Sequence, residues 1–395
     1  MATLCKNCGS GLTFDPKTQM LVCQYCGGSF KAEEVEAEFG DTLEANDITD
    51  SAQGYYNCNI YSCGTCGGEI IIHGTEASAN CIYCGNSTVV FNRISRQKRP
   101  NCIIPFKITK DEALDIIREK FNKGFFVPKA IKNFKAEHVR GIYIPYWIVD
   151  AYHSGAVVIR GTVKHGKSSS TYYYGRSGEM ILHNLPFDAS LLLADESSER
   201  LEPFKMADLM DFDEDYLMGF YSNISDVTFG EIRRSAYNRA VKYFNDYALK
   251  DVKGPSNKTI VSSMEDTALD YGKLKYAMLP AWFVTYDYEG KHNTILVNGQ
   301  TGKIVCGIPW NKPLFYSLLI GSGLLLTVLA FILLRTTLPF MDTSEDSDLG
   351  KVLVAIGTGA VALFVIGIKT MGGVLKSIRL TQARDIFNFA KKRQE

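Results

Sequence analysis

The sequence predicts a multidomain α+β protein: two tandem four-cysteine ribbons, then a two-lobed antiparallel α+β domain, then a C-terminal two-helix transmembrane hairpin. Three features predict this order: a repeated cysteine pattern near the N-terminus, mixed helix and strand patterns in the middle, and two apolar runs near the C-terminus. The composition agrees, because 46% hydrophobic and 22% charged residues suit a globular protein that carries a membrane segment.

Eight of the eleven cysteines form two copies of the pattern Cys-x2-Cys-x14-Cys-x2-Cys. Cysteines two residues apart let a tight turn point both sulfurs at one ion, and two such pairs supply the four thiolates that tetrahedral zinc prefers. A glycine follows the second cysteine of each pair, where a metal-binding turn favours positive φ. We therefore predict two structural zinc ions, with disulfides as the alternative. The predicted ligands are Cys5, Cys8, Cys23 and Cys26 in the first set, and Cys63, Cys66, Cys81 and Cys84 in the second.

The ribbons are expected over residues 1–30 and 56–92, separated by an acidic linker over residues 31–55. Residues 31–50 of this linker contain eight acidic residues and one basic residue. Residues 58–90 contain no lysine or arginine, whereas a protein that binds nucleic acid needs cations to neutralise phosphates. The charge distribution therefore disfavours nucleic acid as a partner of the ribbons.

The two-lobed domain is expected over residues 100–312. Thr109 and Glu112 fit a capping box, in which each side chain satisfies a free amide at a helix start, and Thr228 and Glu231 repeat the pattern. Residues 155–174 and 291–305 are rich in Val, Ile, Thr and Tyr and are interrupted by glycine. These stretches predict antiparallel strands and hairpins.

A local repeat predicts that the two lobes are related. Residues 143–149 (YIPYWIV) resemble residues 278–284 (MLPAWFV), and each copy carries a proline two residues before a tryptophan. Proline is tolerated at a strand start because its missing donor falls outside the ladder. We expect Trp147 and Trp282 to anchor equivalent hydrophobic cores, with ligand stacking as the alternative.

One segment matches a nucleotide-binding pattern but lacks the context that this chemistry needs. Residues 161–168 (GTVKHGKS) fit the phosphate-binding motif G-x4-G-K-S. The motif requires a helix directly after Lys167, whose amides would hold phosphate, but residues 168–175 have a strand-like pattern. The six histidines show no close metal-ligand spacing. We therefore predict that the chain is not an enzyme and has no catalytic residue or organic cofactor.

Two apolar runs predict transmembrane helices over residues 314–334 and 352–371, because each can cross a hydrocarbon layer of about 30 Å. The intervening loop, residues 335–351, has four acidic and two basic residues, whereas the tail, residues 372–395, is basic. Since lysine and arginine concentrate on the cytoplasmic side, we expect a two-span cell-membrane protein with both termini cytoplasmic and an extracytoplasmic loop. Membrane lipid is then a partner. The alternative is a pair of buried core helices.

Several short motifs lie in the middle of the chain, at residues 185–190, 202–204, 216–221, 279–282 and 297–303. Their order is similar to that of bacterial membrane-anchored TFIIB-type zinc-ribbon proteins, which are often labelled primosomal protein N′ or helicase-like. Some of these proteins resemble membrane recruiters of phage-shock-type and SPFH-type envelope-stress modules. The resemblance implies a scaffold with cytoplasmic protein partners.

Together these features predict a non-enzymatic membrane-anchored zinc-ribbon adaptor that recruits cytoplasmic proteins to the inner face of the bacterial membrane. A reducing cytoplasm would keep the cysteines available to metal. The alternative is a membrane-tethered nucleic-acid-binding protein that uses its zinc ribbons.

Overall fold

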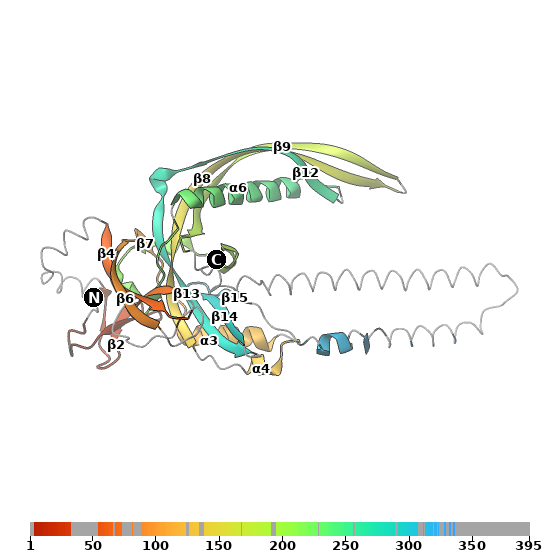
Figure 1. Ribbon diagram of the computed structural model, residues 1–395. Coiled ribbons are helices and arrows are strands. Elements are labelled where there is room, and N and C mark those ends of the chain that lie inside the picture. The colour runs from red at the N-terminus through yellow and green to blue at the C-terminus, as the bar shows by residue number, and fades with distance from the viewer. Residues whose placement is uncertain are drawn as a thin grey trace.

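The computed structural model describes residues 4–32, 54–65, 68–72, 81, 89–123, 126–133, 138–166, 168–190, 195–227, 229–255, 257–288, 291–306, 311 and 313–318, together with single positions up to residue 335. These residues form a small three-stranded sheet, a large sheet and four α-helices. Figure 1 shows the large sheet as the body of the molecule, with a long curved arm at one end.

The small sheet carries the first cysteine pattern. It consists of β1 (Leu12–Asp15), β2 (Met20–Cys23) and β3 (Ser29–Phe30), in the order β1-β2-β3. Leu12 and Phe14 alternate with partly exposed residues along β1, and Leu21 of β2 is fully buried. Alternate residues of a strand point to opposite faces, so one face of this sheet is apolar and packs against the body.

The large sheet has 12 strands among the described residues, and its main path runs β10-β7-β13-β8-β11-β5-β4-β6. Strands β9 and β12 pair with β8, while β14 pairs with β13 and β15. The strands are β4 (Tyr55–Cys63), β5 (Glu69–Ile72), β6 (Val89–Lys98), β7 (Cys102–Ile103), β8 (His138–His165), β9 (Ser168–Asp188), β10 (Met210–Asp211), β11 (Tyr221–Ser222), β12 (Asn257–Leu269), β13 (Lys275–Tyr288), β14 (Lys291–Asn298) and β15 (Ile304–Val305).

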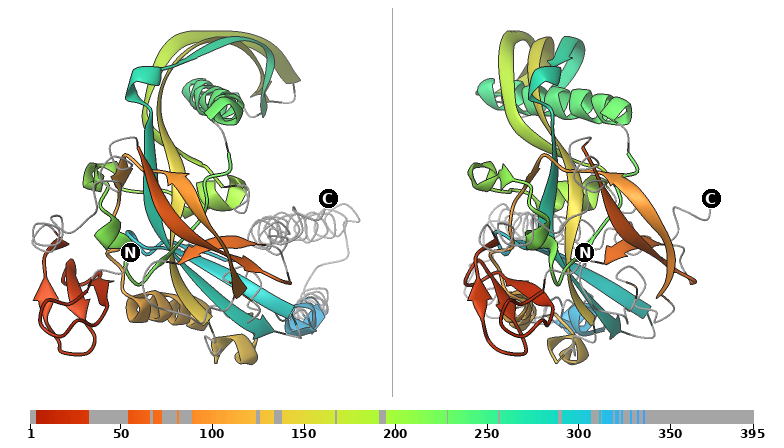
Figure 2. Two further views of the ribbon diagram at one scale, coloured as in Figure 1. Left: turned by 60° about the vertical axis from the view of Figure 1, so that its left-hand side comes forward. Right: turned by 90° about the vertical axis from the view of Figure 1, so that its left-hand side faces the viewer.

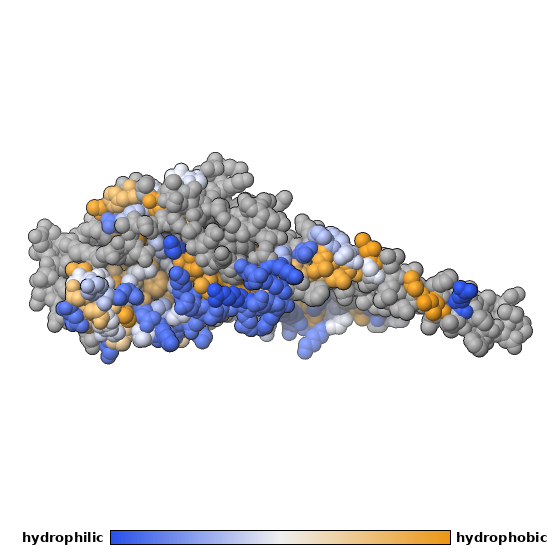
Figure 3. Space-filling model, turned by 90° about the horizontal axis from the view of Figure 1, so that it is seen from below, coloured by the Kyte–Doolittle hydropathy of each residue, from blue (hydrophilic) through white to orange (hydrophobic). Residues whose placement is uncertain are grey.

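The helices are α3 (Lys110–Asn122), α4 (Lys129–Lys132), α5 (Asp195–Leu201) and α6 (Phe229–Asp251). Helix α3 begins with the predicted capping box: the Thr109 side chain accepts from the Glu112 amide, and the Glu112 carboxylate accepts from the Thr109 amide. Its buried residues Ala113, Ile117 and Phe121 recur at helical spacing and face the core. The opposite face of α3 is hydrophilic, and it covers the middle of the underside in Figure 3.

The arm is a three-stranded sheet in which β8 lies between β9 and β12. Figure 2 shows that it curves over α6, which fills its inner face. Phe244 of α6 packs there beside Gly155 of β8, where a Cβ atom would lie 2.7 Å from the phenylalanine ring. Strands β8 and β9 meet at a hairpin turn, in which Gly166 has a positive φ of 60°. The segment that fits G-x4-G-K-S is therefore this hairpin, and Ser168 opens a strand instead of a helix.

The repeated segments lie side by side in β8 and β13. These strands pair antiparallel with Ile144 opposite Leu279, two residues that occupy the same place in the two copies. A local twofold relation therefore passes through this pair. The neighbouring strands follow the same relation. Strand β7 pairs in parallel with β13, and β11 pairs in parallel with β8, and the two pairings lie at equivalent positions of the two copies.

Both tryptophans have equivalent structural roles in this relation. The indole of Trp147 donates to the carbonyl oxygen of Val227 at 3.3 Å, and that of Trp282 donates to Ile108 at 2.8 Å. Val227 and Ile108 each lie two residues before the first residue of a helix, α6 and α3 respectively. Each tryptophan thus ties a strand of one half to the helix start of the other half. The halves interlock in one continuous sheet, so residues 100–306 do not form two lobes.

The C-terminal part of the predicted fold class is also wrong. Across the part of the chain that the structure describes, no helix is both long and apolar enough to span a membrane. Apolar side chains can be buried against protein as well as in lipid. The first run begins with a helical turn capped by the Asn311 side chain, and Phe315 is buried against Phe126 of the body at a ring distance of 5.2 Å.

We therefore discard the transmembrane hairpin over residues 314–334 and 352–371. The predicted cell-membrane location, the two-span topology with cytoplasmic termini and the lipid partner depended on that hairpin and are discarded with it. The extracytoplasmic loop over residues 335–351, the second helix and the tail over residues 372–395 lie outside the described residues, apart from position 335. Most of the acidic linker over residues 31–55 does so as well.

Candidate metal centre

The structure brings the first predicted ligand set together. The sulfur atoms of Cys5, Cys8, Cys23 and Cys26 all lie within 4.8 Å of one another. Cys5 and Cys26 are 3.5 Å apart, as are Cys8 and Cys23. Four sulfurs at a zinc–sulfur distance of about 2.3 Å in a tetrahedron would be separated by roughly 3.8 Å. The cluster therefore has the dimensions of a four-thiolate metal site.

The distances also argue against the disulfide alternative for this set. A disulfide joins its sulfurs at about 2.0 Å, far shorter than the 3.5 Å seen in both pairs. None of the nine cysteines that the structure describes forms a disulfide. These four cysteines can bind a metal ion as thiolates.

Two matching turns position the sulfurs. In each turn a glycine amide donates back to the first cysteine: Gly9 to Cys5 at 2.8 Å, and Gly27 to Cys23 at 2.9 Å. Both glycines have φ of 73°, a left-handed conformation that strains any residue with a Cβ atom. The first cysteine of each turn is buried and the second, Cys8 or Cys26, is exposed. We refer to residues 5–9 and 23–27 as the knuckles.

The two exposed thiols, those of Cys8 and Cys26, hold their protons unequally. Hydrogen bonds from the Ser10 side chain and backbone lower the pKa of Cys8 to about 6. At Cys26 a backbone hydrogen bond from Gly28 lowers the pKa, but interaction with the Cys5 thiol and desolvation outweigh it and raise the pKa to about 12. Close thiolates repel one another, so the last protons are lost only when a cation compensates the charge. A divalent metal would supply that compensation.

The donor set determines which chemistry this centre can support. Four cysteines complete a tetrahedral shell and leave no position for water or substrate, which is typical of structural zinc and not of catalytic zinc. A segment of about 30 residues buries too little apolar surface to fold alone, so a metal would stabilise the ribbon. The residues present therefore fit a structural zinc ion.

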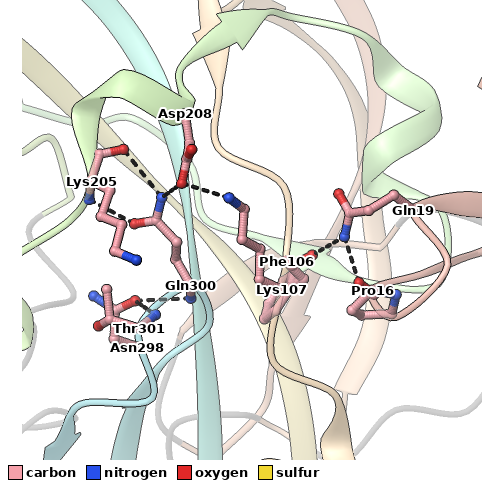
Figure 4. Close-up of polar contacts among 9 residues, drawn as sticks. All are labelled: Pro16, Gln19, Phe106, Lys107, Lys205, Asp208, Asn298, Gln300 and Thr301. Carbon is pink, nitrogen blue, oxygen red and sulfur yellow. Dashed lines mark hydrogen bonds and ion pairs between the residues drawn. The ribbon is translucent and has the colours of Figure 1, made fainter.

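The ribbon is attached to the body by its β1–β2 turn, as Figure 4 shows. The Gln19 side chain donates to the carbonyl oxygen of Phe106 at 2.7 Å, and the Phe14 amide donates to Met218 at 3.0 Å. The Phe14 ring meets Tyr216 edge to face at 4.9 Å. Cys5 and Cys23 belong to the same buried cluster as the core of the body. The knuckles are thus held against the body from one side.

A second polar network lies beside this attachment and was missed by the sequence analysis. Gln300 donates to the Asp208 carboxylate at 2.6 Å, and Lys107 pairs with the same carboxylate at 2.6 Å. Hydrogen bonding from Lys107 is the main reason that the pKa of Asp208 lies below its ordinary value. Buried Asn298 donates to the Leu201 carbonyl oxygen at 2.9 Å. The motif at residues 297–303 therefore fastens loops together (Figure 4).

The second ligand set is described only in part. Cys63 ends β4, Cys81 belongs to the same apolar cluster, and both are buried. Cys66 and Cys84 lie outside the described residues. The Cys63 amide donates to the carbonyl oxygen of Gly68, five residues later, at 2.9 Å. The first set has the same bond twice, from Cys5 to Ser10 and from Cys23 to Gly28. Strand β5 pairs with β11, so this segment is part of the large sheet.

Comparison with known proteins gives a distant relative but no family. No family model matches the chain, and no solved structure matches it. The chain is 28% identical over 312 residues to the uncharacterized protein YdjG of Bacillus subtilis (strain 168), an alignment that covers 76% of this chain and 88% of the relative. The similarity to TFIIB-type zinc-ribbon proteins therefore remains a resemblance of short motifs.

Proposed function

We propose that this chain is a non-enzymatic zinc-ribbon adaptor that binds other proteins through the knuckles of its first ribbon. The observation that carries the proposal is Tyr25, which lies within the second knuckle and is 83% exposed. An aromatic side chain this exposed contributes little to the core, whereas tyrosine is enriched among the residues that anchor protein interfaces. A rigid metal-bound turn would hold this ring in place before a partner arrives.

The adaptor would hold two structural zinc ions. Cys5, Cys8, Cys23 and Cys26 would bind the first. The second would use Cys63, Cys66, Cys81 and Cys84; it is supported by the burial of Cys63 and Cys81 and by the recurring amide bond of the knuckles at Cys63.

Two observations support a binding role over catalysis. The four-thiolate shell has no open coordination position, and the segment that resembles a phosphate-binding loop is a β-hairpin. A protein partner is favoured over nucleic acid, because the first ribbon carries only Lys6 and Lys17 as basic residues before position 31. Nucleic-acid binding depends on several such cations.

The direct test is affinity capture of the full chain from cells that naturally express it, followed by quantitative mass spectrometry. We expect Tyr25→Ala to lose specific protein partners while its zinc content stays at the wild-type level. Tyr247→Ala is the matched control, because Tyr247 is a 74% exposed tyrosine on α6. If Tyr25→Ala captured the same proteins as the wild type and the control, the knuckle would not be the binding surface.

A further inference from the structure

The two outer strands of the arm have edges that could accept another strand. Within the described residues, β9 and β12 each pair only with β8, so one side of each lacks a strand neighbour. Figures 1 and 2 show the arm extending away from the body, with α6 against its inner face and not along the outer edge of β9. An unpaired edge offers a row of amides and carbonyls to an extended chain.

The edge of β12 has features that discourage such pairing. Its register against β8 shifts between Ile260 and Ser262, which marks a β-bulge. It also carries Lys258, whose ammonium group donates to the Val252 carbonyl oxygen at 2.9 Å. Bulges and lysines on edge strands are common protections against unwanted strand addition.

The edge of β9 lacks these protections between Ser168 and Leu182, although the strand has a register shift after Leu182 and carries Pro186. Its register against β8 is continuous from Leu182 to Ser168, and residues 168–185 contain neither lysine nor proline. The equivalent strand of the other half, β14, is paired on its outer side with β15 at Leu296 and Val297. Among the three comparable edges, that of β9 is therefore the open one.

The sequence of β9 is complementary to itself in antiparallel pairing about Ser177. In that register Tyr173 lies opposite Ile181 of the second copy, and these side chains are 66% and 62% exposed. Aromatic and β-branched residues form favourable cross-strand pairs. Tyr172 would likewise face Leu182, and Tyr174 would face Met180.

The neighbouring registers are less favourable than the one centred on Ser177. With Ser177 opposite Ser177, Arg176 and Glu179 each lie opposite a glycine, Gly178 and Gly175 respectively. Shifting the centre by one residue toward the N-terminus places Arg176 opposite Arg176, and shifting it by one toward the C-terminus places Arg176 opposite Met180. Like charges directly opposite destabilise a strand pair, so the first of these shifts is disfavoured. The second shift places Ile181 opposite Gly175 and loses the pairing of Ile181 with Tyr173.

From this edge and this register we propose that two copies of the chain associate by antiparallel pairing of their β9 strands about Ser177. The pairing joins two three-stranded arms into one six-stranded sheet, with both α6 helices on the same face. This inference is independent of the knuckle surface, which lies on the other side of the body in Figure 2.

A charge-swap experiment at Ser177 tests the register, because this exposed residue would face its own copy across the twofold axis. Sedimentation velocity of the full chain should show a dimer for the wild type. Ser177→Lys and Ser177→Glu should each raise the dimer dissociation constant roughly fivefold or more, since each sets like charges opposite one another. An equimolar mixture of the two variants should restore wild-type association or exceed it.

Ser262→Lys is the matched control, because Ser262 is an exposed serine on the protected edge of the same arm, and it should leave the dimer unchanged. A wild-type chain that stays monomeric at about 50 μM would overturn the proposal. The proposal would fail in that case even if a strand of another protein pairs with this edge. A dimer that responds to neither Ser177 variant, or two weakened variants whose mixture does not recover, would overturn it as well.

Discussion

At the scale of single residues, the metal centre depends on backbone conformation as much as on sulfur chemistry. Gly9 and Gly27 both adopt φ of 73°, and each donates its amide to the cysteine that starts its knuckle. A Cβ atom at either position would meet no other atom within 4 Å, so the requirement for glycine is conformational and not steric. The cost of an L-residue in this region is about 1–2 kcal/mol.

This conformational requirement gives a quantitative prediction for Gly27→Ala. The variant should release zinc to a chromogenic chelator roughly ten times more readily than the wild type, because the strain weakens the bound form by about 1–2 kcal/mol. Gly175→Ala is the control, since this glycine in β9 has an ordinary φ and open space around it. Equal release by Gly27→Ala and the wild type would show that the knuckle does not need this conformation.

Spacing alone was enough to predict the first ligand set, because two residues between cysteines correspond to one tight turn wherever the sequence occurs. The attachment of the ribbon could not be predicted in the same way. Gln19 reaches the Phe106 carbonyl oxygen only because the two segments meet in the fold, and nothing about an exposed glutamine in a turn indicates that contact. The pairing of Asp208 with Lys107 was missed for the same reason.

At the scale of elements, α6 and the arm stabilise each other around a buried histidine. His153 of β8 is fully buried, contacts the Phe244 ring at 5.1 Å and hydrogen-bonds to Thr267 of β12 at 2.7 Å. Desolvation lowers the pKa of His153 below its ordinary value of 6.5, although Glu265 and Asp266 oppose the shift. The arm therefore favours the neutral imidazole.

The buried histidine predicts how stability changes with pH. Below pH 6.5 the unfolded chain takes up a proton at His153 that the folded protein resists, so the free energy of unfolding should fall as the pH is lowered. Urea denaturation at about pH 7.5 and about pH 5.5 should show a smaller loss for His153→Gln than for the wild type.

Ser262→Ala on β12 of the same arm is the control for the same measurement and should keep the wild-type loss, because it removes no titratable group. Equal losses of stability in His153→Gln and the wild type would mean that this histidine is not the source of the effect.

Local sequence patterns predicted that certain helices and strands form, but they did not predict how long each one is. The capping box at Thr109 marked the start of α3, since its two hydrogen bonds involve residues only three apart. The strand character of residues 155–174 was also visible in composition. The curvature and length of the arm were not, because they depend on β12 and α6 packing on β8 from a distant part of the sequence.

At the scale of the whole molecule, the two halves exchange helices across a single sheet. The similar segments around Trp147 and Trp282 indicated related halves, and their antiparallel pairing explains why the segments match. Two lobes were the wrong arrangement, because each tryptophan bonds to the helix start of the opposite half. Which helix packs against which half depends on contacts between residues far apart in the sequence, and hydrophobic periodicity does not determine those contacts. The transmembrane hairpin, which was inferred from two uncharged apolar runs and the charges that flank them, was wrong, since no helix in the described part of the chain is long and apolar enough to span a membrane.

The proposed binding role depends on bound zinc, because the knuckles can present Tyr25 to a partner only if a metal holds them. Native mass spectrometry of the full chain, purified under reducing conditions without chelator, measures metal stoichiometry directly. We predict two zinc ions in the wild type and one in Cys8→Ser, which removes a thiolate from the first set alone. A wild-type chain that carries no zinc, or a Cys8→Ser variant that still carries two ions, would contradict the account.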